Sequence, residues 1–155
     1  MFRTLSILFT FLLLNVSSVS SSNFNYGSGY AAKSVLASQS LINAMDKIDN
    51  RIYAVGEHGI ILYSDDFGDS WTQAESVPYT STITDISCPS KQSCWVTGHD
   101  ATILHSNDYG KTWKKQYEDI DWDAPLLSIH MFDDNEGIAL GAFALSLRTV
   151  DGGQT

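Results

Sequence analysis

An eight-residue pattern recurs along this chain at a nearly constant spacing. It runs from Ser64 to Trp71, returns from Ser106 to Trp113, and begins again at Thr149, where seven of its eight positions are present. The first residues of the three copies are 42 and 43 positions apart. A fixed period of this size indicates repeated units that stack on one another, and β-type sequence within each unit predicts propeller blades of four short strands.

The common pattern, Ser/Thr-x-Asp-x-Gly-x-Ser/Thr-Trp, is an Asp-box, and each fixed position has a structural interpretation. The Asp carboxylate accepts backbone N–H bonds that close a hairpin turn, and the Gly supplies a backbone with φ > 0. The hydroxyl residues bond locally, while the Trp opens the next strand and buries its ring between blades. Calcium is disfavoured because it needs several oxygen ligands at one point. The box residues are Ser64, Asp66, Gly68, Ser70 and Trp71, then Ser106, Asp108, Gly110, Thr112 and Trp113, and finally Thr149, Asp151, Gly153 and Thr155.

The repeats also match upstream of the box. Segments 55–64, 97–106 and 140–149 align without gaps around a shared glycine, and an apolar-rich segment precedes each. Each unit therefore predicts an inner strand, a middle strand ending at the glycine, a third strand entering the box, and an outer strand opened by Trp. The inner strands are expected at 41–45, 83–87 and 126–131. The predicted fold is all-β, a partial β-propeller over residues 35–155 with blades at about 35–78, 79–121 and 122–155, the last incomplete.

Fewer than three blades fit in this length, whereas natural propellers close with at least four. An open array leaves a blade face and its strand edges unpaired. We therefore expect the natural protein to continue beyond Thr155.

The N-terminus has the layout of a secretory signal peptide. A short positively charged start is followed by an apolar run of ten residues and then by small residues. The apolar run is too short for a comfortable membrane span, so a retained anchor is the weaker alternative. We assign residues 1–20 to the signal peptide, with cleavage after Ser20 and with Ser18 and Ser22 as alternatives. Residues 21–34 form an expected flexible lead-in, and the protein is expected in the periplasm or outside the cell.

The two cysteines, Cys88 and Cys94, flank a short turn in the second repeat. In an oxidising compartment they would form a disulfide that staples this hairpin. A closed loop of seven residues contributes about 2.4 kcal/mol in the chain-entropy model. Metal binding or redox chemistry is the alternative, but the spacing is not CxxC and no histidines lie nearby. The disulfide is therefore the expected state.

The charge of the chain disfavours two classes of partner. There are 18 acidic and 9 basic residues, which gives a formal net charge of −9. Nucleic acid binding requires a basic surface to neutralise phosphates, and anionic membranes require the same. We expect neither.

The turns between the middle and third strands carry the candidate contacts with a partner. His58 and His99 lie in equivalent turns of adjacent repeats, next to Glu57 and Asp100, whereas the third repeat has no histidine there. A metal bridging the two histidines is a weaker alternative to exposed turn residues. The candidate rim contacts are Glu57, His58, His99, Asp100 and Arg148.

Several features together resemble the photosystem II assembly and stability factor-like propellers. These are the Asp-boxes near a 42-residue spacing, the Gly-x-x-Gly/Ala-x-x-Leu strand before them, the Cys-Pro-Ser…Cys-Trp-Val hairpin over 88–96, and the segment 148–155. The resemblance covers roughly 35–155, and the Asp-box alone is shared with sialidases and sortilin-type receptors. It implies a seven-bladed, non-enzymatic, chaperone-like factor that is exported in bacteria or lies in the thylakoid lumen of a phototroph. It further implies a protein partner, such as a membrane protein under assembly, and neither a cofactor nor a small-molecule substrate.

The alternative function is that of a sialidase-like glycoside hydrolase, because sialidases also carry Asp-boxes. In enzymes of the sialidase type, three arginines bind the substrate carboxylate in bidentate geometry. A Tyr–Glu pair serves as the nucleophile and an Asp as the acid/base. After signal removal this chain keeps only Arg51 and Arg148. Two arginines cannot form such a cluster within this sequence, so we favour the binding scaffold.

Overall fold

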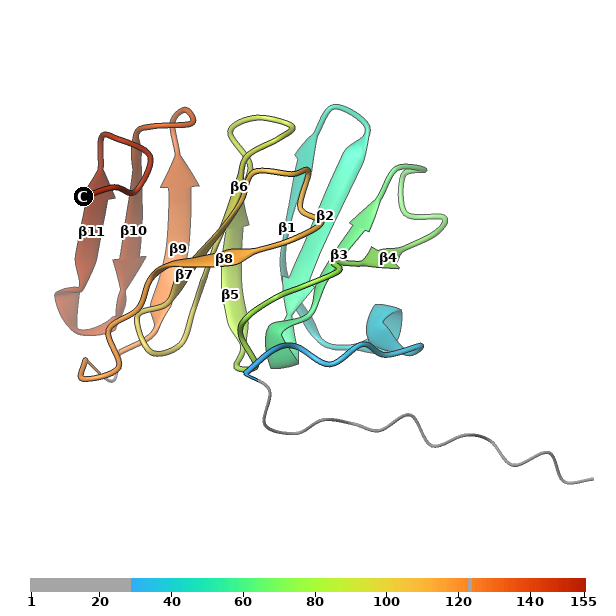
Figure 1. Cartoon of the computed structure of the whole chain (residues 1–155), viewed down its shortest axis with the longest axis horizontal. Helices are drawn as coiled ribbons and strands as arrows, with labels where there is room; N and C mark the ends of the chain where they lie inside the picture. The colour runs from blue at the N-terminus through green and yellow to red at the C-terminus, as the bar shows by residue number, and fades with distance from the viewer. Residues whose placement is uncertain (1–28, 123) are drawn as a thin grey trace, which may run out of the picture.

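Three antiparallel sheets stand side by side in the molecule, and each corresponds to one sequence repeat (Figure 1). The computed structural model describes residues 29–122 and 124–155. The expected signal peptide at 1–20 and the beginning of the expected lead-in therefore lie outside the described residues. No helix within the described ranges is long and apolar enough to cross a membrane.

Blades 1 and 2 are four-stranded sheets in which each strand pairs with the one before it in the chain. Short turns join the strands, which is the connection that antiparallel pairs allow. Blade 1 consists of β1 (Ile42–Ile48), β2 (Arg51–Gly56), β3 (Ile61–Ser64) and β4 (Thr72–Gln73). Blade 2 consists of β5 (Ile83–Ser87), β6 (Cys94–Gly98), β7 (Ile103–Ser106) and β8 (Lys114–Tyr117).

Blade 3 has three strands in the described residues, in the order β11-β10-β9. They are β9 (Leu126–Met131), β10 (Gly137–Gly141) and β11 (Ser146–Thr149). Short 3-10 turns complete the elements: η1 (Ala37–Gln39) precedes blade 1, η2 (Glu57–Gly59) joins β2 to β3, and η3 (Ala142–Ala144) joins β10 to β11.

The predicted all-β blade architecture is confirmed. Two predicted inner strands coincide with β5 and β9, and the third falls on β1. The register repeats as well, because Ile42, Ile83 and Leu126 each pair with the glycine that ends the middle strand of their own blade. The gap-free alignment of the repeats is thus an alignment of equivalent positions in space.

The hydrophobic core lies between the blades. Tyr53 and Ile61 of blade 1 pack with Ile86, Val96 and Leu104 of blade 2. A second cluster joins Trp95 and Ala101 of blade 2 to Leu126, Ile129, Met131, Ala139 and Leu145 of blade 3. Because side chains alternate across a strand, each blade has two faces. The stacking of blades buries the faces that are turned toward a neighbouring blade.

Part of the expected lead-in lies along the outer edge of blade 1. The Lys33 ammonium donates to the carbonyl oxygens of Gln73 and Ala74 at 3.2 and 2.6 Å. The Ser34 amide donates to the side-chain oxygen of Gln73 at 3.0 Å. Ala37 is buried in a small cluster with residues of blade 1. The segment assigned to a flexible lead-in therefore includes residues that hydrogen bonds hold against β4.

Candidate functional site

One carboxylate organises the Asp-box of blade 1. Asp66 Oδ1 accepts hydrogen bonds from the Ser64 hydroxyl at 2.7 Å and the Ser70 amide at 2.9 Å. Asp66 Oδ2 accepts one from the Ser70 hydroxyl at 2.5 Å. The Gly68 amide donates to Ser64 Oγ at 2.8 Å. Both carboxylate oxygens are therefore engaged within their own turn.

The same four bonds recur in the other two boxes. In blade 2 the Asp108 carboxylate accepts from the Ser106 hydroxyl at 2.9 Å and from the Thr112 amide and hydroxyl at 2.9 and 2.6 Å, and the Gly110 amide donates to Ser106 Oγ at 3.0 Å. In blade 3 the corresponding distances are 2.9, 3.0, 2.6 and 2.8 Å, and they involve Asp151, Thr149, Thr155 and Gly153. The sequence interpretation of the box as a turn closed by its carboxylate agrees with this geometry.

These bonds favour the ionised form of the box carboxylates. Hydrogen bonds from Ser70, and then from Ser64, lower the pKa of Asp66 to about 2. Those from Thr155 lower the pKa of Asp151 to about 2. Partial burial acts to raise the pKa of Asp108, but hydrogen bonds from Thr112, Ser106 and the Lys111 backbone together lower it. A general acid needs a pKa near the operating pH, so these carboxylates are poorly suited to proton donation.

The glycine of the box serves both the turn and the contact between blades. Gly110 has a φ of 72°, a left-handed conformation that residues with a Cβ resist. It also lies against the preceding blade, since a Cβ there would come within 2.5 Å of the Tyr53 ring. Gly153 repeats this relation one blade later, where a Cβ would come within 2.9 Å of the Trp95 ring.

The box tryptophans differ in burial because their neighbours differ. Trp113 is buried in the cluster between blades 1 and 2, and its indole N–H donates to the Gly110 carbonyl at 3.0 Å. Trp71 is only half-buried, against the small cluster that contains Ala37. The expected burial of the ring between blades thus holds for Trp113. Trp71 instead lies on the face of blade 1 that no described blade covers.

The predicted disulfide between Cys88 and Cys94 is present, with the two Cα atoms 4.1 Å apart. It joins the end of β5 to the first residue of β6, and both cysteines belong to the core between blades 1 and 2. The described residues contain no free cysteine.

The three turns that follow the middle strands share one backbone conformation but carry different side chains. His58, Asp100 and Phe143 occupy equivalent positions, and each has a φ of 55°. Neighbouring amides anchor the first two turns to the connector of the next blade, from Gly59 to the Ser81 carbonyl at 2.8 Å and from Ala101 to the Ala124 carbonyl at 2.9 Å. The His58 side chain is 82% exposed and Phe143 is 81% exposed. These turns form one end of the molecule, which we call the turn rim (the turns at 57–59, 98–101 and 142–144; lower edge of Figure 1).

Four of the five candidate rim contacts belong to the turn rim. His99 is exposed and Asp100 is half-buried, whereas Glu57 also has a structural contact because its Oε1 accepts the Leu41 amide at 3.0 Å. Over residues 29–122 and 124–155, no group of three or more His, Cys, Asp or Glu side chains is arranged to hold a metal ion.

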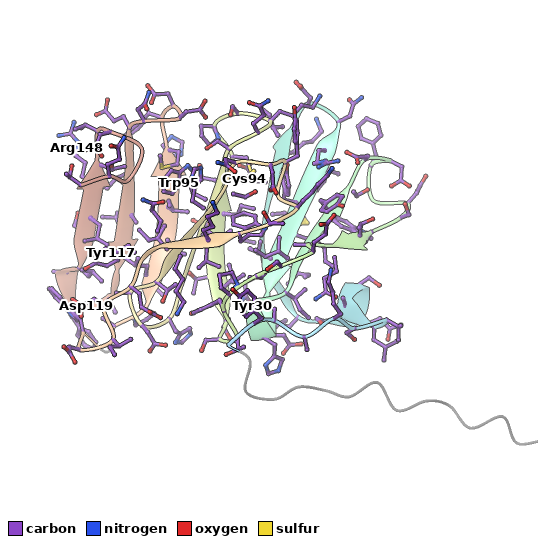
Figure 2. The ribbon with its side chains drawn as sticks, viewed as in Figure 1. Tyr30, Cys94, Trp95, Tyr117, Asp119 and Arg148 are labelled. Atoms are coloured by element: carbon purple, nitrogen blue, oxygen red, sulfur yellow. A yellow bond between two sulfur atoms is a disulfide. The ribbon has the colours of Figure 1, made fainter. Side chains whose placement is uncertain are left out.

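Arg148, the fifth candidate contact, lies elsewhere. It is on β11 beside the third Asp-box, and Figure 2 shows it near the end opposite to the turn rim. Its guanidinium pairs with Glu136 at 2.6 Å. Arg148 is therefore separate from the turn rim. It lies near the end of β11 that enters the Asp-box, whereas the rim turn at 142–144 lies at the beginning of that strand. Arg51, the other remaining arginine, forms a bidentate pair with Asp65 at 2.7 and 2.6 Å.

Sequence reasoning missed a set of bridges between the inner strands of successive blades. Asp46 Oδ2 accepts the Cys88 amide at 2.7 Å, and Ser87 Oγ accepts the Met131 amide at 3.0 Å. Asp46 and Ser87 hold equivalent register positions, opposite Tyr53 and Trp95. The signal in the sequence was a polar residue recurring inside apolar inner strands. Bridges of the opposite direction also occur, in which the side chains of Asn43 and Thr84 donate to the carbonyl oxygens of Ile83 and Leu126.

Repeated antiparallel blades with an Asp-box between the third and fourth strands define an Asp-box β-propeller. A family model described as "Photosynthesis system II assembly factor YCF48" matches residues 73–155, more than half of the chain, and the chain belongs to this family. No curated protein matches the sequence.

Solved structures agree with the fold. The chain is similar to a structure titled "YCF48 bound to D1 peptide", with 21% identity and a TM-score of 0.64 over 74% of this chain and 38% of that one. It is equally similar to YCF48 from Cyanidioschyzon merolae, with 21% identity and a TM-score of 0.63 over 75% and 38%. The chain thus spans about two-fifths of the length of these propellers.

Proposed function

We propose that this chain is part of an exported, non-enzymatic β-propeller scaffold that binds a protein partner through its turn rim, as an assembly or chaperone-like factor. One observation carries the proposal: the three turns of the rim share a backbone conformation yet present His58, Asp100 and Phe143 at the same position. A rigid frame with variable exposed residues is how scaffolds position binding loops.

The hydrogen bonds of the Asp-boxes support a non-enzymatic role. The recurring carboxylates of Asp66, Asp108 and Asp151 use both oxygens to close turns, and their pKa values are lowered. A hydrolase of the sialidase type would need a carboxyl group able to donate a proton. The repeated motif therefore accounts for folding and leaves binding to other residues.

A polypeptide is the partner class that the family favours. One solved YCF48 is titled as bound to a D1 peptide. We extend this to a peptide segment of a membrane protein under assembly, with neither a cofactor nor a small-molecule substrate. The exposed histidines and Phe143 of the turn rim offer stacking, hydrogen bonding and apolar contact, which suits a peptide rather than a single charged group.

Export is supported by two independent features. The first is the charged, apolar and small-residue order of positions 1–20. The second is the Cys88–Cys94 disulfide, since disulfides persist in oxidising compartments. The location that follows is the periplasm, the extracellular space or, in a phototroph, the thylakoid lumen.

Site-specific photo-crosslinking tests the proposal. A photoreactive residue is placed at His58 or at Phe143 in the protein expressed in its exporting cell, and at the exposed Asp69 of the first Asp-box as the matched control. We expect the two rim positions to capture the same protein, identified by mass spectrometry, and the control to capture none of it. Purified chain should also bind a D1 peptide less tightly after His58→Ala and Phe143→Ala are combined. Capture of the partner from Asp69 alone, or no loss of peptide affinity, would contradict the proposal.

A further inference from the structure

The connector between β8 and β9 carries exposed apolar side chains. Ile120 is 73% exposed and Trp122 is 48% exposed. The amides of Asp121 and Trp122 both donate to Asp119 Oδ1 at 3.2 Å, so this part of the connector is a tight turn. Figure 2 labels Asp119 near the lower edge of the molecule, the end that the turn rim forms. The connector thus presents apolar side chains to solvent beside the turn rim.

The preceding connector, between β4 and β5, buries the equivalent side chain. The backbone bonds that anchor both connectors to the turn rim make Ser81 equivalent to Ala124. Tyr79, two positions before Ser81, is only 5% exposed, and its hydroxyl donates to a carbonyl oxygen of the next rim turn. Trp122 stands two positions before Ala124, and the following blade is present beside each connector. The exposure of Trp122 is therefore a property of its own connector.

Phe143 of the turn rim lies next to the same connector. The amide of Ala142 donates to the carbonyl oxygen of Pro125 at 3.0 Å, which places this rim turn against the end of the connector. His58, the equivalent of Phe143 in blade 1, is equally exposed although the next blade follows it, so this position is open in the repeat itself. We call Ile120, Trp122 and Phe143 the connector patch. Gathered exposed apolar residues, and aromatic ones above all, are typical of interaction sites.

Acidic side chains surround the connector patch. Glu118 and Asp121 are exposed on the connector itself. Burial raises the pKa of Tyr79, and the charges of Asp100 and Glu118 raise it further, which places both carboxylates near the same hydroxyl. Lys115 pairs with Glu118 and offsets that charge. The aspartates then set a negative potential around the exposed apolar side chains.

We propose that the connector patch docks an extended, positively charged segment of the partner protein that contains arginine. Charge complementarity favours a cationic occupant, whereas nucleic acid and anionic membranes are repelled. Arginine suits the patch better than lysine, because its planar guanidinium stacks on an indole such as that of Trp122 and pairs with a carboxylate such as Asp121 in bidentate geometry. The inference rests on the proposed function in one respect, that the partner binds at the turn rim.

Peptide titrations test the chemistry of the occupant. The probe is a peptide of alternating arginine and alanine with blocked ends, and matched peptides carry lysine or glutamate in place of arginine. Binding to the full chain is followed by NMR at the indole N–H of Trp122, whose resonance is assigned from Trp122→Phe. We expect the arginine peptide to shift this resonance and to bind more tightly than the lysine peptide, and the glutamate peptide not to bind. The affinity should fall as salt is added, because exposed charges are screened.

Two matched pairs of variants locate the contact. Trp122→Ala should weaken binding of the arginine peptide at least about tenfold, as for an aromatic anchor. Phe67→Ala removes another exposed aromatic ring, in the first Asp-box, and should leave the affinity unchanged. Asp121→Lys and Asp69→Lys change the net charge equally at two exposed positions, and only Asp121→Lys should weaken binding. All four variants are first shown to melt like the parent chain.

The outcomes separate this inference from the proposed function. Absence of binding by the arginine peptide, or equal affinity of the arginine and lysine peptides, would overturn the inference. Equal weakening by Asp121→Lys and Asp69→Lys would also overturn it, in favour of non-specific charge attraction. If a partner is captured from His58 as strongly in Trp122→Ala and Asp121→Lys as in the parent chain, the inference fails and the proposed function stands. Binding of the arginine peptide at Trp122 without capture of any protein from the rim would support the inferred contact and contradict the proposed function.

Discussion

Gly110 of the second Asp-box lies against Tyr53 of the first blade so closely that a Cβ at Gly110 would come within 2.5 Å of the ring. Gly110 thus meets two requirements. The turn needs a left-handed backbone conformation, and the stacking of blades leaves no room for a side chain. The first box provides a comparison. A Cβ at Gly68 would meet no atom closer than 3.6 Å, from Trp71 of its own blade.

Gly110→Ala should therefore destabilise the fold more than Gly68→Ala. Both changes strain a left-handed residue by about 1–2 kcal/mol, and only Gly110→Ala adds overpacking between blades, about 1–3 kcal/mol more. Gly68 has the larger φ, 97° against 72°, so backbone strain alone predicts the opposite order. Denaturant melts of the two variants measure the difference. Equal losses of unfolding free energy in the two variants would show that close packing against Tyr53 does not restrict the residue at position 110.

Asp108→Ala should lower the free energy of unfolding by about 1–3 kcal/mol, because it leaves the Thr112 amide and two hydroxyl groups without their acceptor. The exposed neighbour Asn107→Ala is the control and should melt like the parent chain. Combining Asp108→Ala with Asp66→Ala should shift the unfolding midpoint by close to the sum of the single shifts, since the two carboxylates have no hydrogen-bond partner in common. If Asp108→Ala melts like the parent chain, the box carboxylate does not stabilise the turn and its structural interpretation is wrong.

Stability should fall in acid as the box carboxylates become protonated. The folded pKa of Asp66 is about 2, below its ordinary value of 3.8. A lowered folded pKa gives a stabilisation that is complete above pH 3.8 and is lost as the pH falls toward 2. The parent chain should therefore approach the stability of Asp66→Asn between about pH 4 and pH 2. A difference between the two midpoints that stays constant over this window would contradict the assignment.

Reduction of the Cys88–Cys94 disulfide should lower the free energy of unfolding by about 2.4 kcal/mol, the value for a closed loop of seven residues. Cys88→Ala combined with Cys94→Ala should melt like the reduced chain and should not respond to reductant. Intact-mass measurement of exported protein, with and without reductant, checks the bond itself. Two free thiols after export, or equal melts of oxidised and reduced chain, would contradict this account.

The repeat period and the box chemistry made the blades predictable. Asp66, Asp108 and Asp151 act through bonds to residues two to four positions away, so a local pattern is sufficient to find them. The inner strands followed from the alignment around the shared glycine. The disulfide was also local, because Cys88 and Cys94 flank a single turn.

Contacts between blades were not predictable in the same way. The bridge from Asp46 to the Cys88 amide joins residues 42 positions apart, and its geometry depends on how two sheets pack. The sequence groups Arg148 with the rim contacts, yet its position on β11 puts it near the end of the molecule opposite to the turn rim. Lys33 and Ser34 looked like lead-in sequence, and only the structure shows their bonds to β4.

We expect the recurring Asp of the box to be ionised in the folded chain and to act as a turn residue rather than as a catalytic acid. The most direct measurement is an NMR titration of the side-chain carboxyl carbons of Asp66, Asp108 and Asp151 in the folded chain. Because hydrogen bonds lower the pKa of Asp66 and of Asp151 to about 2, both should show ionised resonances down to about pH 3. Asp108 should titrate below its ordinary value of 3.8. A box carboxyl that stays protonated at neutral pH would contradict the claim and would make that box a candidate active site.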